Sequence, residues 1–269
     1  MKVISRGFNK FFNINERPET KLEMLESSLK FPVTCYVKEN GFLGLVSYNE
    51  ETDDLFITTK SNPNGEAAIN LKTVIDNKLS SHTKDMIKTI CKDKDVTLVF
   101  ECVDMKNDPH IIEYAEDELY LLAVINNTIN FSQYAYEDLV AIAKQLDIKV
   151  KTKAFVLNTY AEFLNWYNKV TADGYLYENR QIEGFVIEDS VGNTVKVKLA
   201  FYVFWKYMRT VSQQTLKNGF IVKTESLTTK TAQDFYKFVQ NIYNTYTKEQ
   251  LENLSKHIIH LRNEFYKNN

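Results

Sequence analysis

Three short apolar runs, separated by turn residues, occupy residues 31–59. In the first run Val33, Cys35 and Val37 alternate with other residues, which is the period of a strand with one buried face. Asn40-Gly41 follows this run, and Asn-Gly between two extended segments is a strong hairpin signal. The pattern therefore predicts a hairpin, with Lys38 at the end of a strand beside a tight turn.

Extended and helical patterns alternate through the following residues. Apolar residues at helical spacing indicate helices over 67–91 (interrupted near 80–81), 136–146 and 159–171. Extended apolar runs indicate strands over 96–103, 110–112, 119–125, 184–188 and 194–201. This mixture predicts an α+β fold with largely antiparallel sheets.

The C-terminal region differs from what precedes it. Apolar residues recur at three- and four-residue steps from Phe235 to Tyr246, which predicts an amphipathic helix. Thr247 to Gln250 form a capping-box pattern opening a second helix, with Leu251, Leu254, Ile258, Leu261 and Phe265 on one face. We therefore predict two parts, a domain over residues 1–225 and a helical hairpin over residues 226–269 whose apolar stripes are docking faces.

Composition excludes several classes of protein. The 269 residues are 44% hydrophobic, which is enough for a sizeable core, and the net charge of -2 means that nucleic acid must bind to a local basic patch. No stretch is long and apolar enough to predict a secretory signal or a membrane span, so we expect a cytoplasmic protein with no membrane partner. Cys35, Cys91 and Cys102 lack zinc-site spacing, and we expect them to be reduced core residues.

Five charged residues form an inventory suited to a nucleoside triphosphate. They are Lys38, Glu101, Glu183, Lys196 and Lys198. A lysine amine can act as a nucleophile, carboxylates can hold ribose and metal, and further cations can neutralise phosphate charge. Each residue alone is more typical of an ordinary strand end or solvent face.

The order and separations of these residues resemble those of the covalent nucleotidyltransferases. Within that superfamily the chain is similar to the ATP-dependent RNA ligases typified by RNA ligase 1 of T-even phages and by fungal tRNA ligases. Six segments carry the resemblance, which covers residues 4–205: 6–13, 38–41, 100–103, 119–126, 183–186 and 196–198. The run from Lys10 to Glu16 and the position of Tyr202 point to the tRNA-repair type.

The resemblance implies a nucleotidyltransferase (adenylation) domain and a role for each matched residue. Lys38 would attack ATP to form lysyl-AMP, Glu101 would hold the ribose, and Glu183 would bind Mg2+, for which Mn2+ could substitute. Val186 and an aliphatic residue near Leu121 would enclose the adenine. The other nucleotide-binding residues would be Arg6, Lys10, Val37, Gly41, Lys196 and Lys198, with Asn40 and Tyr202 as additional active-site residues.

The same resemblance implies the substrates. They would be RNA 5′-phosphate and 3′-hydroxyl ends, such as those of a cleaved tRNA, prepared by an end-healing kinase-phosphatase partner. We expect a monomer that works in RNA repair in a bacterial or phage-infected cell.

Two departures from the family pattern leave alternatives open. Asn40 stands where the commonest motif has aspartate, and phage relatives carry a further strand with an Arg-Gly element before the segment that matches Lys10. These departures suggest a shortened or split ligase, or an RNA-binding subunit with reduced catalysis. A third alternative keeps the chemistry but changes the substrate, to RNA capping or the sealing of DNA nicks.

Overall fold

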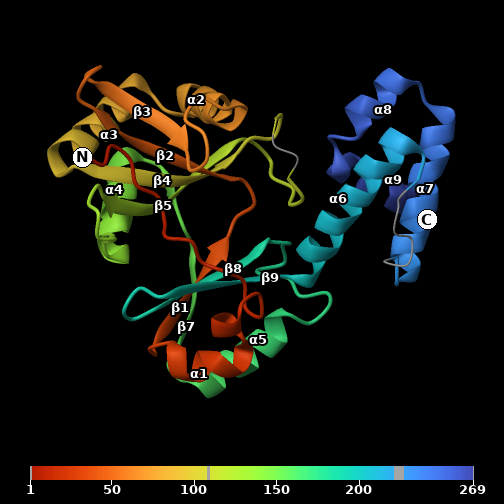
Figure 1. The fold of residues 1–269 in the computed structure, drawn as a ribbon, viewed down its shortest axis with the longest axis horizontal. Helices are drawn as coiled ribbons and strands as arrows, with labels where there is room; N and C mark the ends of the chain where they lie inside the picture. Colours follow the sequence, from red (N-terminus) through yellow and green to blue (C-terminus); the bar gives the residue numbers. More distant parts are fainter. Residues whose placement is uncertain (1, 108–109, 221–226, 269) are drawn as a thin grey trace. The chain divides into compact units, whose positions relative to one another are not determined.

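The computed structural model of this chain describes residues 2–107, 110–220 and 227–268. It has the α+β fold with mainly antiparallel strands that the sequence predicts (Figure 1). Backbone contacts divide the chain into two compact units. Unit 1 comprises Met1–Asp108, Tyr114–Phe163 and Phe185–Val197, and unit 2 comprises Pro109–Glu113, Leu164–Gly184 and Lys198–Asn269.

A five-stranded sheet forms the larger part of unit 1. Its strand order is β3-β2-β4-β5-β6, antiparallel except for the parallel pair β5 and β6. The strands are β2 (Phe42–Asn49), β3 (Asp54–Thr59), β4 (Val96–Val103), β5 (Glu118–Asn126) and β6 (Lys149–Val150). Central strand β4 is buried along its whole length, as its continuous apolar run requires.

Three helices cover one face of this sheet. They are α2 (Glu66–Lys78), α3 (Ser81–Lys94) and α4 (Tyr136–Leu146), and their apolar stripes pack on Phe100, Cys102 and Leu121 (Figure 1). The break predicted near residue 80 is confirmed, because Ser80 caps α3 by accepting a hydrogen bond from the Thr83 N–H. The opposite face carries a smaller apolar cluster, which the N-terminal segment helps to cover.

A second sheet has the strand order β7-β1-β8-β9. Its strands are β1 (Val33–Lys38), β7 (Lys153–Leu157), β8 (Gly184–Asp189) and β9 (Thr194–Lys198). Short helical segments η1 (Pro18–Thr20), η2 (Leu22–Met24) and α1 (Leu25–Ser28) precede it, and α5 (Tyr160–Val170) follows β7. The sequence patterns missed β6 and β7.

The predicted hairpin around Asn40-Gly41 is wrong, because β1 and β2 belong to different sheets. The chain crosses from one sheet to the other at residues 39–41, and neither Asn40 nor Gly41 has the positive φ of a hairpin turn. Glycine is needed here for a different reason. A Cβ on Gly41 would lie 2.1 Å from the carbonyl oxygen of Cys102, so only glycine allows this close approach to β4.

Helices make up most of unit 2. They are α6 (Ala200–Asn218), α7 (Lys230–Thr245), α8 (Lys248–Leu254) and α9 (Ile258–Lys267). An aromatic core joins α6, α7 and α9: the ring of Phe235 lies 5.2 Å from that of Trp205 and 5.4 Å from that of Phe265. The apolar stripes of the C-terminal helices are therefore packing faces, as predicted.

Three sequence predictions of secondary structure need correction. The strand predicted over 194–201 ends at Lys198 and helix α6 follows, with no side-chain cap at Leu199 to signal its start. The helix predicted from Thr247 is two helices, α8 and α9. The capping box is confirmed, but the Ser255 hydroxyl donates to the Glu252 carbonyl where α8 ends, a bond that competes with helical pairing. Residues 110–112 form no strand, because the Ile111 carbonyl accepts from Arg262 instead of a neighbouring strand.

The predicted domain boundary between residues 225 and 226 lies outside the described residues. Within the described ranges, no helix is long and apolar enough to cross a membrane.

Candidate active site

Lys38 ends β1, as the sequence predicts, and its ammonium group faces Glu101 on β4. Lys38 Nζ lies 3.7 Å from Glu101 Oε1, and the two side chains are only 20% and 8% exposed. The same oxygen accepts a hydrogen bond of 2.9 Å from the Gly41 N–H. The crossover glycine therefore fixes the carboxylate against which the amine is placed, in surroundings that screen charge less than bulk water does.

The alternation of β4 explains why a carboxylate is available at this point. Phe100 and Cys102 point into the core under the helices, so Glu101 between them points to the opposite face. Leu43 on β2 lies directly across from Glu101 in the strand register. The same alternation brings Leu122 of β5 to this face, while Leu121 is fully buried in the helix-covered core.

A tyrosine that the sequence analysis missed supports the crossover. Tyr114 Oη accepts the Asn40 N–H at 2.7 Å and donates to Glu39 Oε2 at 2.9 Å. Burial, together with the charge of Glu39, raises the pKa of Tyr114 well above its usual value, so the hydroxyl keeps the proton that it donates. Tyr114 gives no sequence signal, because 74 residues separate it from Asn40.

A cavity of about 330 Å³ surrounds this amine within unit 1. It is lined by Phe8, Asn9, Lys10, Phe11, Val37, Lys38, Glu39, Gly41, Leu43, Lys60, Glu101, Leu122 and Lys196. The structure thus brings together six residues predicted from the sequence: Lys10, Val37, Lys38, Gly41, Glu101 and Lys196. Lys60 was not predicted; its Nζ donates to the Phe8 carbonyl at 3.0 Å and adds another cation to the cavity.

Backbone pairing with β9 holds the N-terminal segment in this cavity. The Lys196 N–H donates to the Phe12 carbonyl at 3.1 Å, and the Ile14 N–H donates to the Lys196 carbonyl at 2.8 Å. The ammonium groups of Lys10 and Lys196 lie 5.1 and 5.0 Å from the ring centres of Phe12 and Phe11. Aromatic rings therefore position both cations.

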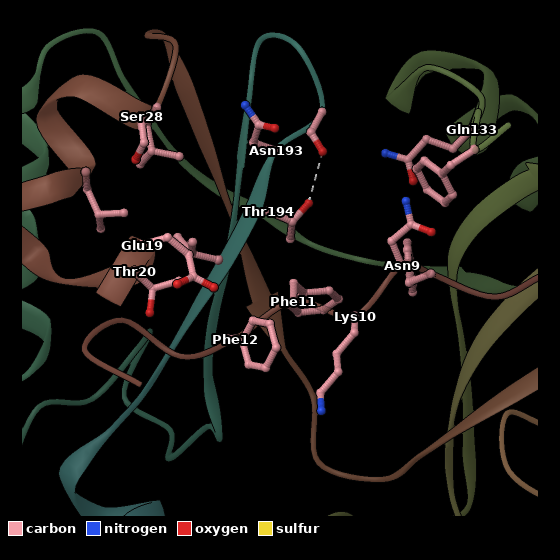
Figure 2. Close-up of a pocket in the computed structure, with 16 residues that line it drawn as sticks. Asn9, Lys10, Phe11, Phe12, Glu19, Thr20, Ser28, Gln133, Asn193 and Thr194 are labelled. Carbon is pink, nitrogen blue, oxygen red and sulfur yellow. Dashed lines mark hydrogen bonds between the residues drawn. The ribbon is translucent and has the colours of Figure 1, made fainter. Parts of the chain in front are cut away.

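A second hollow of about 440 Å³ adjoins the first and shares residues 8–11 with it. Figure 2 shows the rings of Phe11 and Phe12 between the loop at Asn193–Thr194 and the Lys10 side chain, whose amine extends away from that loop. Aromatic rings and amide groups line this hollow, and such groups suit stacking on bases and hydrogen bonding to them.

Three predicted nucleotide-binding residues, Arg6, Val186 and Lys198, do not line the Lys38 cavity. The Arg6 guanidinium lies 5.7 Å from the ring centre of Phe131, and the Arg6 backbone N–H donates to Thr97 Oγ1. Val186 is half-buried on β8, the strand next to β1. Their roles stay predictions.

Glu183, Lys198 and Tyr202 belong to unit 2. Lys198 Nζ forms an ion pair of 2.8 Å with Glu183, which is 2% exposed, and lies 4.7 Å from the ring centre of Tyr202. Tyr202 is buried on α6. The charge of Lys198, followed by burial, lowers the pKa of Lys206.

Metal ligands are sparse. Among the residues that the structure describes, no group of three or more His, Cys, Asp or Glu side chains is placed to hold a metal ion. The three cysteines are free and buried, as predicted. Burial raises the pKa of Cys91 to about 12, so this thiol is not a reactive nucleophile.

Comparison with known proteins identifies relatives by sequence. The chain is 24% identical to the tRNA ligase of Candida albicans in an alignment that covers 90% of this chain and 33% of that protein. It is 27% identical to tRNA ligase 1 of Schizosaccharomyces pombe over 197 residues, which cover 69% of this chain and 24% of that protein. The chain therefore spans about a third or less of these relatives.

Solved structures share the fold. An archaeal ATP-dependent RNA ligase matches 95% of this chain and 63% of its own, with a TM-score of 0.55 and 10% identity. A Naegleria gruberi RNA ligase solved with PPi matches 76% of this chain and 60% of its own, with a TM-score of 0.52 and 13% identity. A family model described as RNA ligase matches residues 1–209, most of this chain, and the chain therefore belongs to the RNA ligase family.

Proposed function

We propose that this chain is the adenylating part of an ATP-dependent RNA ligase and that Lys38 carries AMP between ATP and RNA. The observation that carries the proposal is the partly buried Lys38 amine, held 3.7 Å from a fixed carboxylate in a cavity with the further cations Lys10, Lys60 and Lys196. An ordinary lysine on the protein surface would have neither a fixed carboxylate nor three further cations beside it. The family and the ATP-dependent ligases that share the fold support the same chemistry.

In the first step Lys38 Nζ attacks the α-phosphorus of ATP. An N–P bond forms, the bond from that phosphorus to the pyrophosphate oxygen breaks, and the amine loses a proton. Lys10, Lys60 and Lys196 would neutralise charge on the phosphates. Glu101 would hold the ribose, as the family resemblance implies.

Two further steps would complete the reaction. The 5′-phosphate of an RNA attacks the lysyl-AMP phosphorus, which transfers AMP to the RNA and returns the lysine. A 3′-hydroxyl then attacks the activated phosphate, forms the phosphodiester bond and displaces AMP. We propose RNA or tRNA repair as the setting, with ends prepared by a separate kinase-phosphatase.

Magnesium, or manganese in its place, would supply a Lewis acid that neutralises phosphate charge. The residues fit such an ion, because Mg2+ is commonly bound through one or two carboxylates and substrate phosphates rather than by an all-protein cage. Glu183 is the carboxylate we assign to it, by resemblance to the family.

The decisive experiment detects the covalent intermediate. The protein is incubated with magnesium and ATP labelled at the α-phosphate, and the labelled peptide is identified by mass spectrometry. We expect AMP on the Lys38 peptide, none in Lys38→Met, and wild-type labelling in Lys144→Met, which alters an exposed lysine of α4. A wild-type protein that takes up no AMP would refute adenylation and favour the RNA-binding subunit.

A second experiment tests the substrate. The adenylated protein is given a nicked duplex whose broken strand is RNA, and a matched duplex whose broken strand is DNA. We expect sealing of the RNA strand with a 5′-phosphate and a 3′-hydroxyl. Preferential sealing of DNA, or labelling by GTP in place of ATP, would support the third alternative instead.

A further inference from the structure

Arg17 is an exposed cation of unit 1 that the proposed reaction does not use. Its guanidinium lies 4.8 Å from the ring centre of Phe12, and the Lys10 ammonium lies 5.1 Å from the same ring centre. Phe12 lines the second hollow, and Lys10 lines both this hollow and the Lys38 cavity. One ring therefore holds two positive charges, one at the active site and one beyond it.

No carboxylate of the described residues forms an ion pair with either of these cations. Glu16 and Glu19 lie within two residues of Arg17, yet the Glu16 carboxylate binds Asn13 instead, accepting from its N–H at 2.9 Å and from its Nδ2 at 2.5 Å. Other lysines of unit 1 do form ion pairs with carboxylates, among them Lys78, Lys84 and Lys88. The charges of Lys10 and Arg17 are therefore available to an anionic ligand.

Hydrogen bonds within residues 13–20 fix the backbone at Arg17. The Arg17 N–H donates to Thr20 Oγ1 at 3.0 Å, and the same hydroxyl donates to the Asn13 carbonyl at 2.8 Å. Thr20 is buried, and the bond from the Ile14 N–H to the Lys196 carbonyl joins this segment to β9. A guanidinium on a fixed backbone loses less conformational freedom when it binds a ligand.

The second hollow gives this ligand room for an uncharged aromatic group. It is lined by four rings that are each only partly buried, those of Phe8, Phe11, Phe12 and Phe131. In Figure 2 the Phe11 ring lies between the Lys10 side chain and the loop at 193–194. Glu19 also lines the hollow, and its carboxylate would repel a phosphate placed there. A nucleotide would therefore keep its phosphate on the cations and place its base in the hollow.

We propose that Arg17, together with Lys10, binds the phosphate backbone of the RNA strand that receives AMP, and that an unpaired base of this strand stacks on Phe11 in the second hollow. The inference rests on the proposed function, because the reaction at Lys38 identifies the ligand as RNA. Lys10 contacts this strand once pyrophosphate has left. Phosphate contacts and stacking both position the strand without reading its sequence.

The test measures binding of a short, single-stranded, 5′-phosphorylated RNA by fluorescence anisotropy, without ATP. We expect Arg17→Met to weaken binding about tenfold. The slope of log Kd against log salt concentration should fall by about 0.7, the value for one phosphate contact on a single strand. Arg17→Lys keeps the charge and should recover part of the affinity.

A second RNA tests the stacked base. The same strand with abasic residues in place of its bases should bind to wild-type protein about tenfold more weakly, because stacking on a ring is lost. In Phe11→Leu the difference between the two RNAs should shrink.

The matched control is Arg180→Met, which should keep the wild-type affinity and salt slope. Arg180 is also an exposed arginine beside a ring, 6.0 Å from the ring centre of Tyr177, but it belongs to unit 2. Wild-type affinity and slope in folded Arg17→Met would overturn the inference, and so would equal binding of the two RNAs by wild-type protein. The comparison of the two RNAs needs no variant, so it decides even if a variant does not fold. A failure of the proposed function looks different, because RNA would then bind through Arg17 while ATP left Lys38 unlabelled.

Discussion

Replacing Gly41 with alanine should disable Lys38 without changing any charged residue. The new Cβ would lie 2.1 Å from the Cys102 carbonyl oxygen and 2.7 Å from its carbon, both of them backbone atoms of the central strand β4. These atoms cannot swing away like the end of a flexible side chain, so the crossover must move outward by about 1 Å, and a misplacement of about that size can reduce a reaction rate about 100-fold. The overpacking itself should lower the free energy of unfolding by about 1–3 kcal/mol.

The expected rate loss has a specific cause. Moving Gly41 lengthens the 2.9 Å hydrogen bond from its N–H to Glu101, and Glu101 is the carboxylate against which the Lys38 amine is placed. The assay is single-turnover labelling of Lys38 by ATP, with urea unfolding measured in parallel. We expect labelling to fall about 100-fold in protein that is still folded.

Gly174→Ala is the matched control for this substitution. Gly174 has a φ of 77° and open space around its Cα, so alanine there adds backbone strain of about 1 kcal/mol without touching the crossover. The control should be destabilised yet label at the wild-type rate. Wild-type labelling by folded Gly41→Ala, or an equal loss in Gly174→Ala, would refute the argument that the approach to Cys102 positions the lysine.

Three further substitutions test other contacts. Tyr114→Phe should cost about 2 kcal/mol of unfolding free energy and slow Lys38 labelling about tenfold, because two hydrogen bonds at the crossover are lost; wild-type values of both would contradict this role. Lys198→Met should destabilise the protein by about 3 kcal/mol because it leaves the buried Glu183 unpaired from this cation, and adding Glu183→Gln should recover part of that loss in urea unfolding. The third test concerns the pH dependence of stability at Glu113. Desolvation raises the pKa of Glu113, but hydrogen bonds from Arg262 and Asn263 outweigh this effect and hold the pKa below its usual 4.5. The stabilisation from these contacts is therefore present above about pH 4.5 and is lost as the pH falls through the lowered pKa. Arg262→Met should reduce this pH dependence, measured as the free energy of urea unfolding against pH.

Local sequence patterns predicted the regular elements well where a single period dominates. The strand expected over 96–103 and the helix expected over 136–146 have those bounds in the structure, because side-chain period depends only on residues two to four positions apart. The start of α6 was missed because Leu199 offers no capping side chain. The hairpin at Asn40-Gly41 was predicted wrongly because the same dipeptide also fits a crossover where glycine is required by a close contact.

The site residues also fall into those that the sequence predicted and those that it missed. Lys10, Val37, Lys38, Gly41, Glu101 and Lys196 were named from motif order, and the structure gathers them in one cavity. Tyr114 and Lys60 carry no comparable signal, since each acts through a partner far away in the chain.

The sequence by itself determined the periods of the strands and helices, the chemical groups available for phosphate chemistry, and the resemblance to RNA ligases. Only the tertiary structure decided that β1 and β2 enter different sheets and that Gly41 packs against Cys102. The physical reason is range. Strand and helix periods arise between neighbours in the chain, whereas the hydrogen bond from Gly41 to Glu101 joins residues 60 positions apart and exists only once both sheets have formed.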